Sequence, residues 1–227
     1  MMVPIRSVLS FGVALMAAAA VAAGEAPAGR VQVMAHGGAR EQAPENTAAA
    51  LERSIADGVD CVAVDVRSSR DGRHVLMHDA NLEPTTDGLG PVDGRTLAEL
   101  KSLDAGSKFA RRYAGEKVPS LEEVLTLAKG RVRLDLDCRQ VNAAQLVQAV
   151  LDAGMESQVV VSADPAVLKA VRAAAGGDRL ALVPKWKPAD GLDAFSDLKP
   201  EAVEVDADDV TPDPTPAIHD RGVKDHA

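Results

Sequence analysis

The sequence predicts an α/β fold in which short strands alternate with longer helices. Short apolar runs rich in Val, Leu and Ala are separated by segments with helical periodicity. Residues able to cap helices precede several of these segments, and glycines follow them. Strand, helix and strand in repeated order predict parallel strands with helices outside. Several strands in one chain of this length favour a βα-barrel over an open sheet.

Each element has its own local signal. The expected strands are Val31–Ala35, Cys61–Val66, His74–Met77, Val132–Leu136, Gln158–Ser162, Leu180–Val183 and Ala202–Val205. The expected helical segments are Thr47–Asp57, Leu121–Lys129, Ala143–Ala153 and Pro165–Ala174, with a polar turn at Leu192–Leu198. Asn46, Ser120 and Asn142 are the expected N-caps, and Glu123 completes a capping box with Ser120.

The N-terminus has the pattern of a secretory signal peptide. Met1–Ala23 carries one charge, Arg6, followed by an uncharged apolar run that ends on small residues. A retained membrane anchor is the alternative, but the run is shorter than the ~20 residues of a spanning helix. We therefore expect an exported protein, periplasmic or extracellular, without stable membrane insertion. Residues 24–227 would form one domain.

Composition excludes some partners and indicates the state of the thiols. The formal net charge is −9 and the chain has no basic run, which argues against nucleic-acid binding. Cys61 and Cys138 are expected on opposite faces of different strands, so two free thiols are favoured over a disulfide.

Two features break the strand–helix repeat. Ala80–Pro119 is a long insertion rich in Gly, Asp and Thr with one short helix, Leu97–Leu103, and it is expected to be a functional loop or lid. After a short helix at Pro216–Asp220, the sequence stops where an eighth strand should start. We therefore expect seven parallel strands, the eighth missing, and an open seam between Val31–Ala35 and Ala202–Val205.

Carboxylates occur at the ends of two expected strands. Asp65 ends one strand, and Asp135 and Asp137 share a face at the end of another. A buried carboxylate is costly unless it is paired or binds a metal. One such aspartate alone would be taken as structural, but three at strand ends indicate a site.

Two histidines stand at similar positions. His36 and His78 each follow an apolar strand where it meets its loop, the position that acid–base chemistry in a barrel requires. Glu45 lies at a helix start, where it either favours the helix dipole or faces the same opening. His74 is expected at the surface.

These motifs together resemble the glycerophosphodiester phosphodiesterase family. The resemblance is carried by His36-Gly37-Gly38-Ala39, Pro44-Glu45-Asn46-Thr47, Asp65-Val66, Asp71-Gly72, His78-Asp79, Thr85-Thr86-Asp87-Gly88, Leu103-Asp104-Ala105-Gly106 and Val118-Pro119-Ser120-Leu121-Glu122-Glu123. It covers Val31 to Leu136 well and the rest loosely.

The resemblance implies a TIM barrel that hydrolyses a phosphodiester to an alcohol and a phosphomonoester with the help of a divalent cation. His36 and His78 would be the acid–base pair. Asp79 and Arg139 are the expected substrate contacts. The substrate would be a small phosphodiester.

A metal site follows from the same resemblance. Asp65 corresponds to one of the family's metal ligands, and Asp135, Glu45 and Asp137 are the further candidates. Oxygen ligands suit Mg²⁺ or Ca²⁺, and no cysteine or histidine cluster suggests zinc.

The chain departs from the family at several positions. The family's first motif is His-Arg-Gly, and its arginine is Gly37 here. Its Glu-x-Asp metal pair is Ala63-Val64-Asp65, so one carboxylate is absent, and Pro84 replaces the arginine that usually precedes two threonines.

The later Glu-x-Lys motif has two possible registers. It corresponds either to Asp135-Leu136-Asp137, which is preferred because it needs no gap, or to Asp137-Cys138-Arg139, which retains a basic residue.

The favoured function is hydrolysis of glycerophosphodiesters, which these departures would impair. The alternatives are a non-catalytic relative that binds a ligand or partner, and a truncated inactive product. An open seam would also expose apolar surface that favours self-association.

Overall fold

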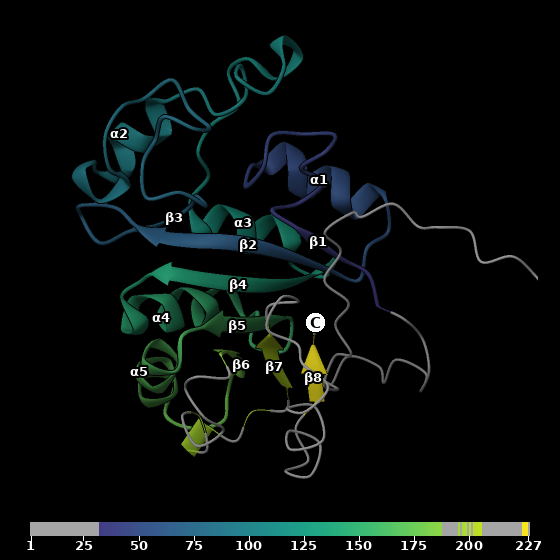
Figure 1. Cartoon of the computed structure of the whole chain (residues 1–227), viewed down its shortest axis with the longest axis vertical. Helices are drawn as coiled ribbons and strands as arrows, with labels where there is room; N and C mark the ends of the chain where they lie inside the picture. Colours follow the sequence, from purple (N-terminus) through teal and green to yellow (C-terminus); the bar gives the residue numbers. More distant parts are fainter. Residues whose placement is uncertain are drawn as a thin grey trace, which may run out of the picture.

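The computed structural model describes residues 32–187, 195, 197–198, 200, 202–205 and 224–226. Its centre is a curled sheet, with α4 (Ala143–Ala153) and α5 (Pro165–Ala175) beside its strands (Figure 1). The expected signal peptide, most of the turn at Leu192–Leu198 and the helix at Pro216–Asp220 lie outside the described residues.

The other elements follow the predicted order. The strands are β1 Met34–His36, β2 Cys61–Ser68, β3 His74–Leu76, β4 Arg133–Gln140, β5 Val159–Ala163, β6 Ala181–Trp186, β7 Ala202–Val205 and β8 Lys224–His226. The remaining helices are α1 Ala48–Ala56, α2 Leu97–Ser102 and α3 Leu121–Ala128, with short 3₁₀ turns at Val92–Gly94 and Arg111–Tyr113.

The sheet is an incomplete parallel barrel. Its strands follow the order β1-β2-β4-β5-β6-β7-β8, and every neighbouring pair in that order is parallel. Among the described residues no ladder joins β1 to β8. The predicted count of seven parallel strands is correct, but the expected seam is misplaced, because Ala202–Val205 pairs with the additional strand Lys224–His226.

The prediction for His74–Met77 is wrong in direction. β3 pairs antiparallel with β2, with Val66 opposite Leu76 and Ser68 opposite His74. The connection between β2 and β3 is a tight turn, whereas a parallel crossover needs about a dozen residues or more. The two strands therefore form a hairpin, and β3 does not contribute to the barrel.

Two of the three predicted N-cap residues cap their helices in the structure. Ser120 and Glu123 form the predicted capping box at α3, and the Asn142 side chain accepts from the Gln145 amide at α4. The first prediction is wrong, because Thr47 caps α1. Asn46 has other partners, which belong to the site described below.

Alternate side chains of the strands form two apolar cores. The larger lies between the sheet and the helices and contains Val62, Val64 and Leu134. The smaller lies on the other face and contains Met34, Cys61, Ala63, Val160, Val183 and Ala202. The small side chains of this inner core fit the narrow interior of a barrel.

Both cysteines are buried free thiols, as predicted. Cys61 lies in the inner core and Cys138 in the outer one, so they occupy opposite faces of the sheet. Burial raises the pKa of Cys61 to about 12, and burial also raises the pKa of Cys138. Neither group is a thiolate at neutral pH.

Residues 80–119 project from the sheet beyond β3 and include α2 (Figure 1). They have an apolar core of their own, shared with the end of β3, in which Val75, Leu82, Leu100 and Val118 are buried. His74, expected at the surface, is 3% exposed at the start of β3. Burial lowers its pKa. Among the described residues no helix is long and apolar enough to cross a membrane.

Candidate functional site

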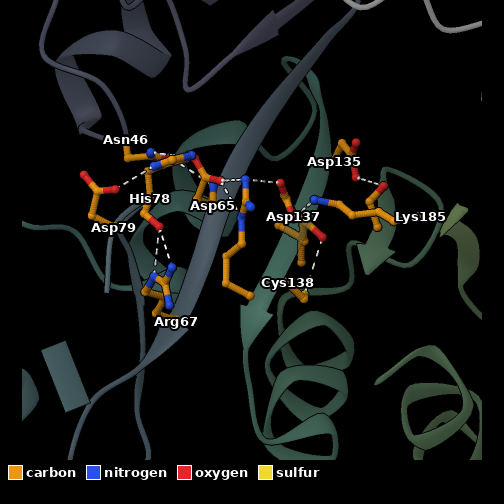
Figure 2. Close-up of polar contacts among 12 residues, drawn as sticks. Asn46, Asp65, Arg67, His78, Asp79, Asp135, Asp137, Cys138 and Lys185 are labelled. Carbon is orange, nitrogen blue, oxygen red and sulfur yellow. Dashed lines mark hydrogen bonds and ion pairs between the residues drawn. The ribbon is translucent and has the colours of Figure 1, made fainter. Parts of the chain in front are cut away.

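The polar side chains of the inner face gather beyond the small apolar core, at the carboxyl ends of the strands. On β2 the inner face runs from Cys61 through Ala63 to Asp65, and the β4 register places Asp135 opposite Ala63 and Asp137 opposite Asp65. Carboxyl ends of barrel strands are where active sites lie in this fold class. Figure 2 shows the resulting network of contacts.

Asp65 is held by Asn46 from the loop before α1. The Asn46 amide Nδ2 donates to Asp65 Oδ2 at 2.8 Å, and the Asp65 backbone N–H donates to Asn46 Oδ1 at 2.9 Å. Asn46 has a φ of 55°, a left-handed conformation that asparagine tolerates better than most residues. The two side chains are buried and fix the β1–α1 loop to β2.

Arg139 joins Asp65 to Asp137. Its Nε and Nη2 lie 3.2 and 3.0 Å from Asp65 Oδ1, and Nη2 lies 2.9 Å from Asp137 Oδ2. Desolvation lowers the pKa of Arg139, but the carboxylates of Asp137 and Asp65 outweigh it and the net pKa is raised. The expected substrate contact at Arg139 thus lies in the site, bound to two buried acids.

Lys185 from β6 completes this row of charges. Its Nζ lies 2.6 Å from Asp137 Oδ1, whereas Arg139 binds the other oxygen of Asp137. Asp65, Arg139, Asp137 and Lys185 therefore alternate in sign, which compensates the cost of burying two carboxylates. The Lys185 and Arg139 side chains remain 25% and 32% exposed, so solvent reaches both cations.

Asp135 lies on the same inner face of β4, two residues before Asp137, and is buried. The Ser162 hydroxyl donates to its Oδ1 at 2.7 Å. Burial raises the pKa of Asp135 to about 7, against the lowering effect of that hydrogen bond, while Glu204 and Asp137 raise it further. A substantial share of Asp135 is therefore protonated at neutral pH.

The two predicted catalytic histidines flank the end of β2. His36 pairs with Ala63, and Met77, the residue before His78, donates its N–H to the Asp65 carbonyl at 2.9 Å. Both histidines therefore follow strands that end beside Ala63–Asp65. The pKa of Glu204 on β7 is raised by desolvation, against the lowering effect of the Lys185 ammonium.

His78 is held from two sides. Its Nδ1 lies 3.1 Å from Asp79 Oδ1, and its backbone carbonyl accepts from Arg67 Nε and Nη2 at 2.9 and 2.7 Å (Figure 2). Asp79, expected to contact substrate, thus lies against the imidazole. This contact favours the tautomer with a proton on Nδ1, which leaves Nε2 to accept one.

A cavity of about 360 Å³ opens beside Glu45. It lies between the β1–α1 loop and residues 80–119, and its lining includes Arg40, Glu45, Thr85, Lys108 and Phe109. Glu45 is half-buried, and its Cβ stands 3.4 Å from where a Cβ on Gly37 would lie. Gly37 has a φ of 67°, so an arginine there would be strained in this backbone.

The expected metal ligands do not assemble into a cation site. Both oxygens of Asp65 and both of Asp137 are bound by side-chain donors of the protein, and Asp135 is partly neutral. Among the described residues no three His, Cys, Asp or Glu side chains are placed to hold a metal. The set Asp65, Asp135, Glu45 and Asp137 therefore does not fit a divalent ion, which needs several carboxylate oxygens directed at it.

Sequence reasoning missed several residues of the site. Lys185 lies beyond the expected strand Leu180–Val183, although continued alternation places it on the inner face with Val183. Asn46 is the expected helix cap, but it binds Asp65 instead. Arg67 and Ser162 carry no local signal, because their partners, His78 and Asp135, come from other segments of the chain.

Comparison with known proteins shows which family the chain resembles. The glycerophosphoryl diester phosphodiesterase family matches residues 36–190. The glycerophosphodiester phosphodiesterase of Caldanaerobacter subterraneus subsp. tengcongensis is 36% identical over 137 residues, covering 57% of this chain and 56% of that protein. That of Bacillus subtilis (strain 168) is 40% identical over 104 residues, covering 42% of this chain and 36% of that protein. The chain thus spans about half or less of these relatives.

Solved structures share the fold over most of the chain. A glycerophosphodiester phosphodiesterase from Agrobacterium tumefaciens superposes with a TM-score of 0.74 at 27% identity, covering 85% of this chain and 84% of that one. An Oleispira antarctica phosphodiesterase in complex with the product sn-glycerol-3-phosphate gives 0.76 at 27% identity, covering 86% and 82%. Since the family match extends over most of the chain and the barrel is shared, the chain belongs to the glycerophosphoryl diester phosphodiesterase family.

Proposed function

We propose that this protein hydrolyses glycerophosphodiesters to an alcohol and a phosphomonoester. The observation that carries the proposal is the pair of histidines at the carboxyl end of β2, where His36 pairs with Ala63 and the residue before His78 pairs with Asp65. Two imidazoles beside one strand end can serve one phosphate. Family membership supports the same reaction class.

The two histidines divide the proton transfers. One takes the proton of the attacking hydroxyl, from water or from the substrate itself, and the other gives a proton to the oxygen that leaves phosphorus. The Asp79 contact with Nδ1 prepares His78 to act through Nε2, and Arg67 holds its backbone. Asn46 and Asp65 keep the His36 loop against β2.

The cavity beside Glu45 is the proposed place for the substrate's head group. It adjoins the β1–α1 loop that follows His36, and residues 80–119 supply Thr85, Lys108 and Phe109 to its wall. Arg40 and Lys108 give it positive charge, and Glu41 and Glu45 give it negative charge. Such a lining suits a small polar head group.

Among the described residues, the expected ligands Asp65, Asp135, Glu45 and Asp137 are not arranged to hold Mg²⁺ or Ca²⁺, because Arg139 and Lys185 bind Asp65 and Asp137. The proton transfers are therefore assigned to His36 and His78 alone.

The direct experiment is to incubate the full chain with glycerophosphocholine and follow the products by phosphorus NMR. The account predicts loss of the diester signal and growth of a phosphomonoester signal. A folded chain that leaves glycerophosphocholine and glycerophosphoethanolamine unchanged, with or without added Mg²⁺ or Ca²⁺, would contradict it.

We also propose export to the periplasm or the extracellular space through Met1–Ala23. N-terminal sequencing of the protein recovered from its native cells should start just after this segment. Recovery of protein that begins at Met1 would contradict cleavage.

Self-association through the open edges of the incomplete sheet is a further proposal. It predicts a mass above that of one chain in light scattering. A monomer at all concentrations would contradict it.

A further inference from the structure

Two cations of the chain occupy the carboxylate oxygens that a divalent ion would need. Arg139 from β4 bridges Asp65 and Asp137, with contacts of 3.0 and 2.9 Å from one nitrogen, Nη2. Lys185 from β6 binds the other oxygen of Asp137 at 2.6 Å. The amide of Asn46 binds the remaining oxygen of Asp65. Every oxygen of these two acids thus has a donor from the protein.

A divalent ion placed where Arg139 and Lys185 meet these carboxylates would have to displace both cations. Displacement would leave a guanidinium and an ammonium beside the ion in a half-buried site, where like charges repel strongly. Asp135 is already engaged, because the Ser162 hydroxyl donates to its Oδ1 at 2.7 Å. Ala63, opposite Asp135 in the β2–β4 ladder, has no side-chain oxygen.

Arg139 and Lys185 also have further N–H donors with which to bind an anion. A guanidinium has five N–H donors and an ammonium has three. The contacts above use Nε and Nη2 of Arg139 and one direction of the Lys185 ammonium. Both side chains are partly exposed on the inner face, the side on which Ala63 and Asp65 of β2 also lie. Planar guanidinium groups bind phosphate oxygens in pairs.

We infer that Arg139 and Lys185 replace the divalent cation of this site, so that the protein binds the phosphate group of its ligand without a metal ion. This inference deepens the proposed function and rests on it for the identity of the phosphate ester. Asp65, Asp137 and Asn46 act as positioning residues that hold the two cations toward the site.

The experiment is calorimetry on the full chain with sn-glycerol-3-phosphate as the probe, in buffer with excess EDTA and again with millimolar Mg²⁺ or Ca²⁺. The expected result is saturable binding whose dissociation constant is the same in all three buffers. Titration of Mg²⁺ or Ca²⁺ alone into the chain should give no saturable heat. Binding that disappears in EDTA, or stoichiometric uptake of either ion, would overturn the inference.

Substitutions of Arg139 and Lys185 test whether these two side chains bind the phosphate group. Arg139→Ala and Lys185→Ala should each weaken binding of the probe by about tenfold or more, which corresponds to about 1.4 kcal/mol. Arg139→Lys should recover part of the loss, since it keeps the charge and gives up the planar fork. Arg70→Ala is the matched control, because Arg70 forms an exposed ion pair with Glu99 outside the site. Equal affinity in Arg139→Ala, Lys185→Ala and the control would overturn the assignment.

The measurements that need no variant keep the inference testable if a variant fails to fold. They also separate it from the proposed function. Probe binding that is unaffected by EDTA, in a chain that hydrolyses no diester, supports the inference and contradicts the enzyme. Hydrolysis that stops in EDTA and returns with Mg²⁺ or Ca²⁺ supports the enzyme and contradicts the inference.

Discussion

Arg139 Nη2 lies 3.0 Å from Asp65 Oδ1 and 2.9 Å from Asp137 Oδ2, so one guanidinium neutralises two carboxylates from neighbouring strands. The two acids are 1% and 4% exposed. Without Arg139 they would face each other across the β2–β4 ladder, and Lys185 would contact Asp137 alone. The pair of acids is therefore tolerated because of Arg139.

Arg139→Ala should lower the free energy of unfolding by about 2–4 kcal/mol, because removing one partner of a buried ion pair leaves uncompensated charge. Urea denaturation followed by circular dichroism measures the change. Arg53→Ala is the control, since the exposed Arg53–Asp57 pair should contribute about 0.5 kcal/mol or less. Equal destabilisation by the two substitutions would show that Arg139 has no special role.

Asp135→Asn should make the folding stability of the protein depend less on pH. The pKa of Asp135 is raised from 3.8 to about 7 in the folded state, so the folded state holds a proton that the unfolded state releases between these values. The stability contributed by this group is complete below pH 4 and is lost as pH rises to 7. Asparagine keeps the acceptor for Ser162 without the charge.

The expected gain from Asp135→Asn is therefore on the order of 4 kcal/mol at pH 8 and less than about 1 kcal/mol at pH 4. Thermal melts of both proteins across this pH range provide the measurement. A variant that is destabilised equally at both pH values would contradict the raised pKa.

Asn46 can be tested by separating its conformation from its hydrogen bonds. Asn46→Gly keeps a residue at ease with a φ of 55° but removes both contacts with Asp65, and Asn46→Ala removes the contacts and adds backbone strain. Glycine should cost about 1–3 kcal/mol and alanine about 1 kcal/mol more.

The control for Asn46 is Asn142→Ala, which removes a helix cap at α4 and should cost about 1 kcal/mol without affecting the site. Hydrolysis of a glycerophosphodiester should fall in both Asn46 variants and stay unchanged in the control. A full rate in Asn46→Gly would show that the Asp65 contacts do not support the reaction.

Much of the fold followed from local signals in the sequence. Periodicity and capping residues predicted α3 and α4 closely, because Ser120, Asn142 and the glycine after α4 act on their own backbone neighbours. The direction of β3 was missed because two strand-like runs look alike whether they pair parallel or antiparallel. The short turn between β2 and β3 was the available signal.

The sequence predicted several residues of the site, but it did not predict which side chains they contact. His36, Asp65 and Asp137 could be assigned to strand ends from alternation alone. Their partners could not, because Lys185 comes from a strand 48 residues beyond Asp137 and pairs with it only through the curl of the sheet. Whether a buried carboxylate meets a metal or a lysine is decided by such distant contacts, so alternation alone could not predict the Lys185–Asp137 pair.

The acid–base roles of His36 and His78 are the central claim of this account. The most direct test is the steady-state rate of glycerophosphocholine hydrolysis by the unchanged chain and by His36→Ala and His78→Ala, with Arg70→Ala as control. The account predicts measurable turnover that each histidine variant lowers by about 100-fold or more, while the control keeps the full rate. Histidine variants that are folded and turn over the diester as fast as the control would contradict it.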